Sequence, residues 1–193
     1  DPMAADLVGI ALTAREGQGY YVPIDHKPQA PISNIQYPIV VEKLKPLLQN
    51  PNIPKYAHNA NYDLTVLVEQ GLDVAPVTCD TMIAEWLINP SSRNLGLKNL
   101  TWNRLGVEMT PIEDLIGKGK KQITMDQVPV ERVCDYACAD SDIALRLTHL
   151  LEKALREQDL WDLFHSLELP LVPVLTEMEH NGVKLDVSVL RGM

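Results

Sequence analysis

Two apolar runs of strand length flank a glycine-containing turn near the start of the chain. The runs cover residues 7–13 and 20–24, and Gly17-Gln18-Gly19 lies between them. Because glycine adopts the backbone angles that tight turns require, this pattern predicts an antiparallel hairpin. Pro23 has no N–H to donate to a neighbouring strand, so the second strand is expected to end there or to lie at a sheet edge.

Beyond the hairpin and a loop, segments with helical periodicity alternate with short apolar runs typical of strands. The loop is expected over residues 25–37, the helices over approximately 38–48, 61–70, 81–88, 95–105 and from 130 onward, and the strands end at His58 and Cys79. Asp80 is placed to cap the third of these helices, and Pro129 to open the last one. This order of elements predicts a three-layer α/β fold with a mixed sheet.

The balance of apolar and charged residues is ordinary for a globular protein. Of the 193 residues, 46% are hydrophobic and 22% are charged, and no apolar run is long enough to span a bilayer. Three cysteines, Cys79, Cys134 and Cys138, favour reduced thiols in a cytoplasm. The last two could form half of a metal site, but packing on one helix face is the preferred interpretation because the chain has no second cysteine pair.

The formal net charge of −9 argues against binding of nucleic acid through a broad basic face. A cleft that binds one strand end is still compatible with this charge, because metal ions and a few basic side chains can meet phosphates locally. The basic residues that could do so are Arg93, Lys98, Arg104, Lys118, Lys120 and Lys121. The alternative interpretation of the last three is a solvated loop.

Tyr136 and Asp140 are four residues apart in the long predicted helix. This spacing places the phenol and the carboxylate on the same helix face, where they could hold a metal ion and orient its water. The alternative is a surface carboxylate beside a half-buried tyrosine. A second carboxylate, Asp63, is expected in the first turn of the helix that follows His58.

Both segments have counterparts in a known family. His58-Asn59-Ala60-Asn61-Tyr62-Asp63 and Tyr136-x-x-x-Asp140 resemble the second and third exonuclease motifs of the proofreading 3′–5′ exonuclease domain of family A DNA polymerases, the bacterial DNA polymerase I type. Residues 116–122 resemble the basic loop of that domain, and residues 168–175 with 179–183 resemble the segment that leads into the polymerase domain. The resemblance covers essentially the whole chain, with its motifs in the family order.

The resemblance implies a ribonuclease-H-like fold and hydrolysis of 3′-terminal phosphodiesters with two divalent ions, Mg²⁺ or Mn²⁺. By the same resemblance, Asp63 and Asp140 are metal ligands, and Tyr136 orients the attacking water. The residues implied to contact DNA are Asn59, Lys118, Lys120, Lys121 and Met125. For Met125, ordinary packing is the alternative.

The chain departs from the family pattern in one respect. The first motif, Asp-x-Glu, belongs on the strand just before Leu7, yet no Asp-x-Glu occurs anywhere in the sequence. Two of the four acidic ligands and the central strand of the sheet are therefore expected to be missing. We expect a fragment of a longer polymerase that is inactive by itself, with a vestigial exonuclease domain as the alternative.

The character of the sequence changes near residue 160, and Pro170 and Pro173 are expected to interrupt a helix beyond it. The predicted domains are residues 1–160, the exonuclease domain, and residues 161–193, the start of a polymerase domain in the same parent chain. The expected substrate is a single-stranded 3′ end of DNA, in a bacterial cytoplasm, associated with the nucleoid and away from membranes. The alternatives are a catalytically silent structural or DNA-binding module and RNA trimming of the ribonuclease D type.

Overall fold

The computed structural model of the chain describes residues 2–27 and 33–192, so positions 28–32 of the predicted loop and the two terminal residues lie outside it. The predicted hairpin is confirmed, because β1 (Gly9–Arg15) and β2 (Gln18–Pro23) are antiparallel. Gly17 lies in the turn at φ +76°, a left-handed angle that glycine adopts without strain. Pro23 is the last residue of β2, as its missing N–H predicts.

A second pair of strands forms a separate sheet. β3 (Lys55–Ala57) and β4 (Val77–Asp80) are parallel, and α2 (Ala60–Glu69) connects them in the chain. The described residues thus form two two-stranded sheets, one antiparallel and one parallel. The mixed α/β character is confirmed, whereas the missing central strand stays a prediction.

The other helices follow the predicted order. Their bounds are α1 Tyr37–Leu48, α3 Thr81–Ile88, α4 Leu97–Leu105, α5 Glu113–Ile116 and α6 Val130–Glu157, with short 3₁₀ turns η1 Pro2–Ala4, η2 Gly119–Lys121 and η3 Met125–Gln127. Pro129 immediately precedes α6, and Gly106 ends α4 at φ +66°. The predicted start of the last helix at Pro129 is therefore confirmed.

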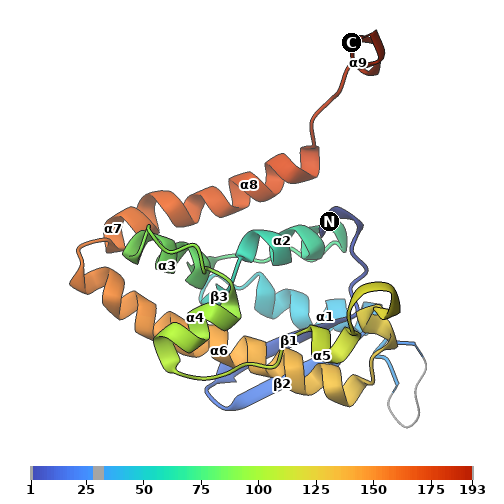
Figure 1. The fold of residues 1–193 in the computed structure, drawn as a ribbon, viewed down its shortest axis with the longest axis horizontal. Helices are drawn as coiled ribbons and strands as arrows, with labels where there is room; N and C mark the ends of the chain where they lie inside the picture. The colour runs from blue at the N-terminus through green and yellow to red at the C-terminus, as the bar shows by residue number, and fades with distance from the viewer. Residues whose placement is uncertain (1, 28–32, 193) are drawn as a thin grey trace.

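The long helix α6 is the element on which the others pack. Figure 1 shows it crossing the molecule, and it contacts the β1–β2 hairpin as well as α3 and α4. Leu147, Leu151 and Leu155 are fully buried in the main core, together with apolar residues of α2, β4, α3, α4 and α8. A smaller apolar cluster surrounds Val133 near the start of α6. One helix therefore joins the hairpin to the rest of the core.

The C-terminal part consists of α7 (Trp161–Leu163), the π-helical turn η4 (Phe164–Glu168), α8 (Leu169–Asn181) and α9 (Val187–Gly192). The prediction that Pro170 and Pro173 interrupt the helix is wrong. Pro170 lies in the first turn of α8, and Pro173 lies inside the helix, which continues to Asn181. A proline inside a helix costs about 3 kcal/mol, and the burial of Phe164 and Val172 against the core offsets that cost.

α8 packs along α2, whereas α9 stands away from the body of the molecule (Figure 1). The domain boundary near residue 160 stays a prediction. The structure adds that α8, which lies beyond that boundary, contributes Leu169 and Val172 to the same core as α2 and α6.

Gly19 is a position where the hairpin and α6 approach closely, and its replacement tests this packing. A Cβ added at Gly19 would lie 2.5 Å from Cβ and 3.0 Å from Cα of Cys138. We expect Gly19→Ala to lower the free energy of unfolding by about 1–3 kcal/mol, the usual cost of overpacking. Chemical denaturation measures this loss.

Gly96→Ala is the matched control, because nothing lies within 4 Å of a Cβ at Gly96 and its φ is −63°. An equal loss in the two variants would show that the close contact between β2 and α6 does not limit stability.

Candidate active site

The structure places Tyr136 and Asp140 one turn apart in the N-terminal half of α6. The Tyr136 phenol and the Asp140 carboxylate are close enough to shift each other's pKa, and both side chains are partly buried. Burial raises the pKa of Asp140 to about 6, although the neighbouring Tyr136 hydroxyl and the positive charge of Lys98 oppose the shift. The pKa of Tyr136 is also raised, chiefly by burial and then by the Asp140 charge. The predicted phenol–carboxylate pair is therefore present.

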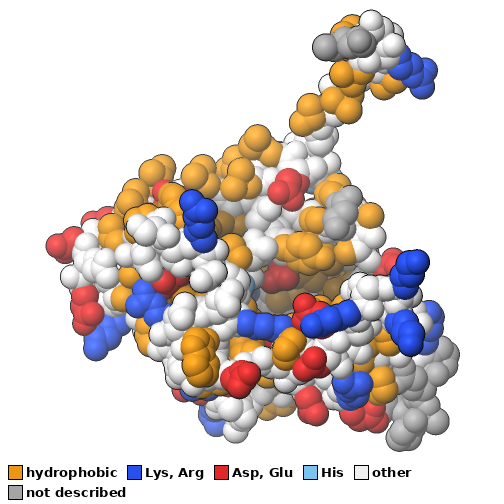
Figure 2. Space-filling model, in the orientation of Figure 1, with side chains coloured by type: hydrophobic (Ala, Val, Ile, Leu, Met, Phe, Trp, Pro, Cys, Tyr) orange, Lys and Arg blue, Asp and Glu red, His pale blue; other side chains and the backbone are white. Residues whose placement is uncertain are grey.

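Asp63 lies in the first turn of α2, as predicted. Its side chain retains solvent-accessible surface, yet surrounding protein desolvates the carboxyl group and raises its pKa to about 6, with a smaller contribution from the charge of Asp80. Figure 2 shows a hollow between α2 and the α4–α5 segment, with an acidic side chain on its floor and Lys or Arg side chains along one rim.

Asp80 holds the start of α2 in addition to capping α3. The sequence predicted only the cap. The buried carboxylate of Asp80 accepts hydrogen bonds from the backbone N–H groups of Met82 and Ile83, at 2.8 and 3.3 Å, which confirms it as the cap of α3. The same carboxylate accepts the N–H groups of Asn59 at 3.2 Å and Ala60 at 2.7 Å, at the start of α2. One side chain therefore holds the first turns of two helices.

The residues before α2 form a sharp connection from β3. Asn59 has a left-handed backbone, at φ +64°, and an exposed side chain. Nδ1 of His58 lies 2.9 Å from the hydroxyl oxygen of Thr81, and burial lowers the pKa of this histidine. Asparagine tolerates the left-handed conformation better than most residues. The strand-to-helix turn thus directs the Asn59 side chain to the surface, where its predicted contact with a nucleotide stays a prediction.

Asn61 joins α2 to α8, a contact that the sequence did not predict. Its side-chain oxygen accepts a hydrogen bond from the Thr176 hydroxyl at 2.9 Å, and its nitrogen donates to Glu179 at 2.9 Å. Farther along the same interface, Nδ1 of His180 lies 2.6 Å from a carboxylate oxygen of Glu69. The helix that presents Asp63 is therefore braced from the C-terminal side of the chain.

The basic loop is exposed, which both interpretations of it, DNA contact and a solvated loop, require. Lys118, Lys120 and Lys121 lie around η2, and none of them makes an ion pair within the part of the chain that the structure describes. Arg104 is committed elsewhere, because its Nε lies 2.8 Å from the buried Glu85 carboxylate. Met125 is half-buried and packs on the cluster around Val133, so the packing interpretation holds for at least part of its surface.

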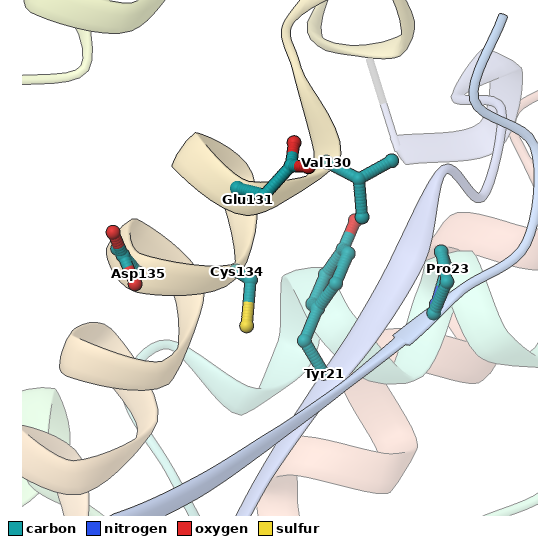
Figure 3. A pocket seen from close by; sticks show the side chains of 6 residues that line it. All are labelled: Tyr21, Pro23, Val130, Glu131, Cys134 and Asp135. Atoms are coloured by element: carbon teal, nitrogen blue, oxygen red, sulfur yellow. The ribbon is translucent and has the colours of Figure 1, made fainter. Parts of the chain in front are cut away.

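Another recess lies on the side of α6 that faces the hairpin. Tyr21, Pro23, Val130, Glu131, Cys134 and Asp135 line it, as Figure 3 shows. The Tyr21 hydroxyl is 2.8 Å from Nε2 of the buried His26, and burial raises the pKa of Tyr21 to about 12. Sγ of Cys134 and Sγ of Cys138 are 3.9 Å apart and do not form a disulfide. Cys138 packs beneath Gly19, which supports the packing interpretation of this pair.

Carboxylates alone do not assemble a complete cation site here. Among residues 2–27 and 33–192, no group of three or more His, Cys, Asp and Glu side chains is arranged to hold a metal ion. Whether Asp63 and Asp140 face one cleft stays a prediction. Within the same residues, no helix is both long and apolar enough to cross a membrane.

Comparison with known proteins connects these elements to one family. The family model described as 3′-5′ exonuclease matches residues 1–156. DNA polymerase I of Chloroflexus aurantiacus is 43% identical over 195 residues, which cover 98% of this chain and 20% of that protein. DNA polymerase I of Pseudomonas aeruginosa is 33% identical over 193 residues, which cover 98% of this chain and 21% of that protein. The chain thus spans about a fifth of the length of these bacterial relatives.

Solved structures share the fold. The POL domain of Pol1 from M. smegmatis, in complex with DNA primer-template and dNTP, matches with a TM-score of 0.71 and 24% identity, over 91% of this chain and 26% of that one. Brucella melitensis NrnC bound to pGG matches with a TM-score of 0.69 and 22% identity, over 93% and 79% of the two chains. NrnC with bound Mg²⁺ matches with a TM-score of 0.60 and 25% identity, over 75% and 67%. The predicted ribonuclease-H-like fold is confirmed.

Substitution of Asp80 tests how strongly the fold depends on one carboxylate. Asp80→Asn replaces one carboxylate oxygen with an NH₂ group. This group is a donor and faces backbone N–H groups that are also donors. We expect the free energy of unfolding to fall by about 2–4 kcal/mol, because hydrogen bonds to a buried charged acceptor are lost. Asp73→Asn is the control, since Asp73 is exposed and accepts only a surface hydrogen bond from Gln49. Equal losses would contradict the role assigned to Asp80.

The raised pKa of Asp140 predicts a pH-dependent stability. Because this carboxyl titrates near pH 6 when folded and near its ordinary 3.8 when unfolded, the folded state binds the proton more tightly. Stability therefore falls as pH rises from about 4 to 6, and the full cost of the charged form is present at pH 7. After allowance for solvent screening, we expect Asp140→Asn to stabilise the metal-free chain by about 1 kcal/mol at pH 7.

Denaturation in EDTA at pH 4 and pH 7 measures this effect, and the gain should vanish at pH 4. Asp135→Asn, an exposed carboxylate on the same helix, is the control. A gain of equal size at both pH values would mean that the burial of the Asp140 charge is not its cause.

Proposed function

The chain belongs to the 3′-5′ exonuclease family found in DNA polymerase I, and from this premise we propose that it is the portion of a longer DNA polymerase that removes nucleotides from the single-stranded 3′ end of DNA during proofreading. The observation that supports the proposal most directly is the pairing of Tyr136 with the partly buried carboxylate of Asp140 one turn away on α6. A desolvated carboxylate beside a phenol suits an acidic metal ligand with a neighbouring group that orients water.

In this proposal Asp140 and Asp63 are the carboxylates that hold Mg²⁺ or Mn²⁺, and two ions bind in a longer parent chain. The residues suit magnesium in type, because it prefers oxygen ligands and is often held by one or two carboxylates plus substrate phosphate. The likeness to the Mg²⁺-bound NrnC supports the choice of metal. When bound, divalent ions stabilise the attacking and leaving oxygens of phosphodiester hydrolysis.

The side chains of this chain then have separate tasks. The Tyr136 hydroxyl orients the attacking water by accepting or donating one hydrogen bond. Asn59 contacts the terminal nucleotide from the turn before α2, and the exposed part of Met125 meets an unpaired base. The lysines of the basic loop, Lys118, Lys120 and Lys121, neutralise phosphates of the strand.

The rest of the parent protein is part of the proposal. We place the exonuclease domain at residues 1–160 and the start of a polymerase domain at 161–193, since the relatives are DNA polymerases about five times longer. We further propose action in the bacterial cytoplasm, at the nucleoid, where such an enzyme meets its DNA.

A catalytically silent module is the second candidate. The feature that motivates it is the absence of Asp-x-Glu from the sequence as given. A silent module would space the polymerase domain or bind DNA without cutting it.

Hydrolysis of a 3′-labelled single-stranded oligonucleotide with Mg²⁺ or Mn²⁺ separates the two candidates. We expect little cleavage by this chain and strong cleavage by a version extended upstream through an Asp-x-Glu strand, because two carboxylates hold the ions weakly. In the extended version, Asp140→Ala should lower the rate at least 100-fold, whereas Asp135→Ala, an exposed carboxylate of the same helix, should retain it.

Equal activity of the short and extended versions would show that the ligands are misassigned. Inactivity of both, with the fold intact by circular dichroism, would favour the silent module.

A further inference from the structure

Trp102 is exposed in a way that the core does not explain. It lies on α4 with 61% of its surface accessible, and within the described residues it makes no aromatic or cation–π contact. Trp161, by contrast, is covered by the guanidinium of Arg156 at 3.5 Å from its ring centre. Because an exposed indole buries a large apolar area only when a ligand covers it, Trp102 is a candidate contact surface.

A recess of about 250 Å³ adjoins this ring. Lys98, Trp102, Glu108 and Met109 line it. Met109 is half-buried and packs on the main core, so it forms a firm apolar wall, while Lys98 and Glu108 supply the polar edge. The recess thus combines an aromatic face, an apolar wall and a cation, the groups that bind an unpaired nucleotide.

The position of Lys98 connects this recess to the candidate active site. Lys98 and Trp102 are four residues apart on α4, so they share one helix face, separated by a rise of about 6 Å along the axis. α4 packs against α6 through Leu100, which is fully buried, and the positive charge of Lys98 reaches Asp140. Lys98 therefore shares the recess with the exposed indole and is near enough to Asp140 for its charge to act on that carboxylate.

We propose that Lys98 and Trp102 form a subsite for single-stranded nucleic acid, in which Trp102 stacks on a base and Lys98 contacts the adjacent phosphate. The subsite rests on the proposed function, and it assigns the path of the strand from Asp140 along the outer face of α4. Stacking tolerates any base, so the subsite binds strands without sequence preference. The subsite is proposed to bind a nucleotide of the strand other than the terminal one.

Binding of a 5′-fluorescein-labelled oligothymidylate, followed by fluorescence anisotropy in EDTA, tests the subsite without hydrolysis. We expect Trp102→Ala to weaken binding about tenfold and Trp102→Phe to restore most of it, because phenylalanine still offers a stacking face. Trp86→Ala is the matched control, since Trp86 is an exposed tryptophan on α3, outside the recess, and should leave binding unchanged. Lys98→Ala should lower the slope of log affinity against log salt by about one.

The outcomes separate this subsite from the proposed function. The subsite is overturned if the wild-type chain does not bind the oligonucleotide, or if wild type and Trp102→Ala bind it equally well. It is also overturned if Trp102→Ala changes only the self-association of the chain, measured by sedimentation. Loss of binding in Trp102→Ala with unchanged thermal unfolding supports it, even if no version of the chain hydrolyses DNA. In that case only the proposed function fails.

Discussion

A single buried carboxylate sets the geometry on which the candidate site depends. Asp80 ends β4 and accepts backbone N–H groups from the first turns of both α2 and α3. Four donors around one charge make the carboxylate a better partner for these helix ends than water, since its charge also meets the positive ends of two helix dipoles. Asp63 lies one turn into α2, so its position depends on the hydrogen bond between Asp80 and Ala60 that holds the start of this helix.

The second constraint is that one helix serves two surfaces. α6 presents Tyr136 and Asp140 on one face, and on another face it packs so closely against β2 that Gly19 has no room for a Cβ. The hairpin therefore fixes the rotation of α6 about its axis, and that rotation decides where Asp140 points. Thr13 and Ser141, whose hydroxyl oxygens lie 2.7 Å apart, reinforce the same alignment one residue beyond Asp140.

The sequence predicted those structural features that depend only on residues close together in the chain. The hairpin, the helix position of Asp63 and the four-residue spacing of Tyr136 and Asp140 all depend on residues close in sequence. The second task of Asp80 could not be predicted, because it requires the parallel register that sets Ala57 opposite Asp80. The prediction for Pro173 was wrong for the same reason. Its helix is kept intact by packing against the rest of the core, and the local sequence pattern carries no information about that packing.

Charge decides how such a protein can hold a nucleic acid strand. With a net charge of −9, the long-range field opposes a polyanion, so affinity must come from short-range contacts within a Debye length, about 10 Å at 0.1 M salt. Few cations are available for this, because Arg104 is already paired with Glu85. Stacking is insensitive to salt, whereas phosphate contacts weaken as salt rises. A strand held by Lys98 and the basic loop together with aromatic faces would therefore bind locally, which suits the capture of one frayed end better than a grip on duplex DNA.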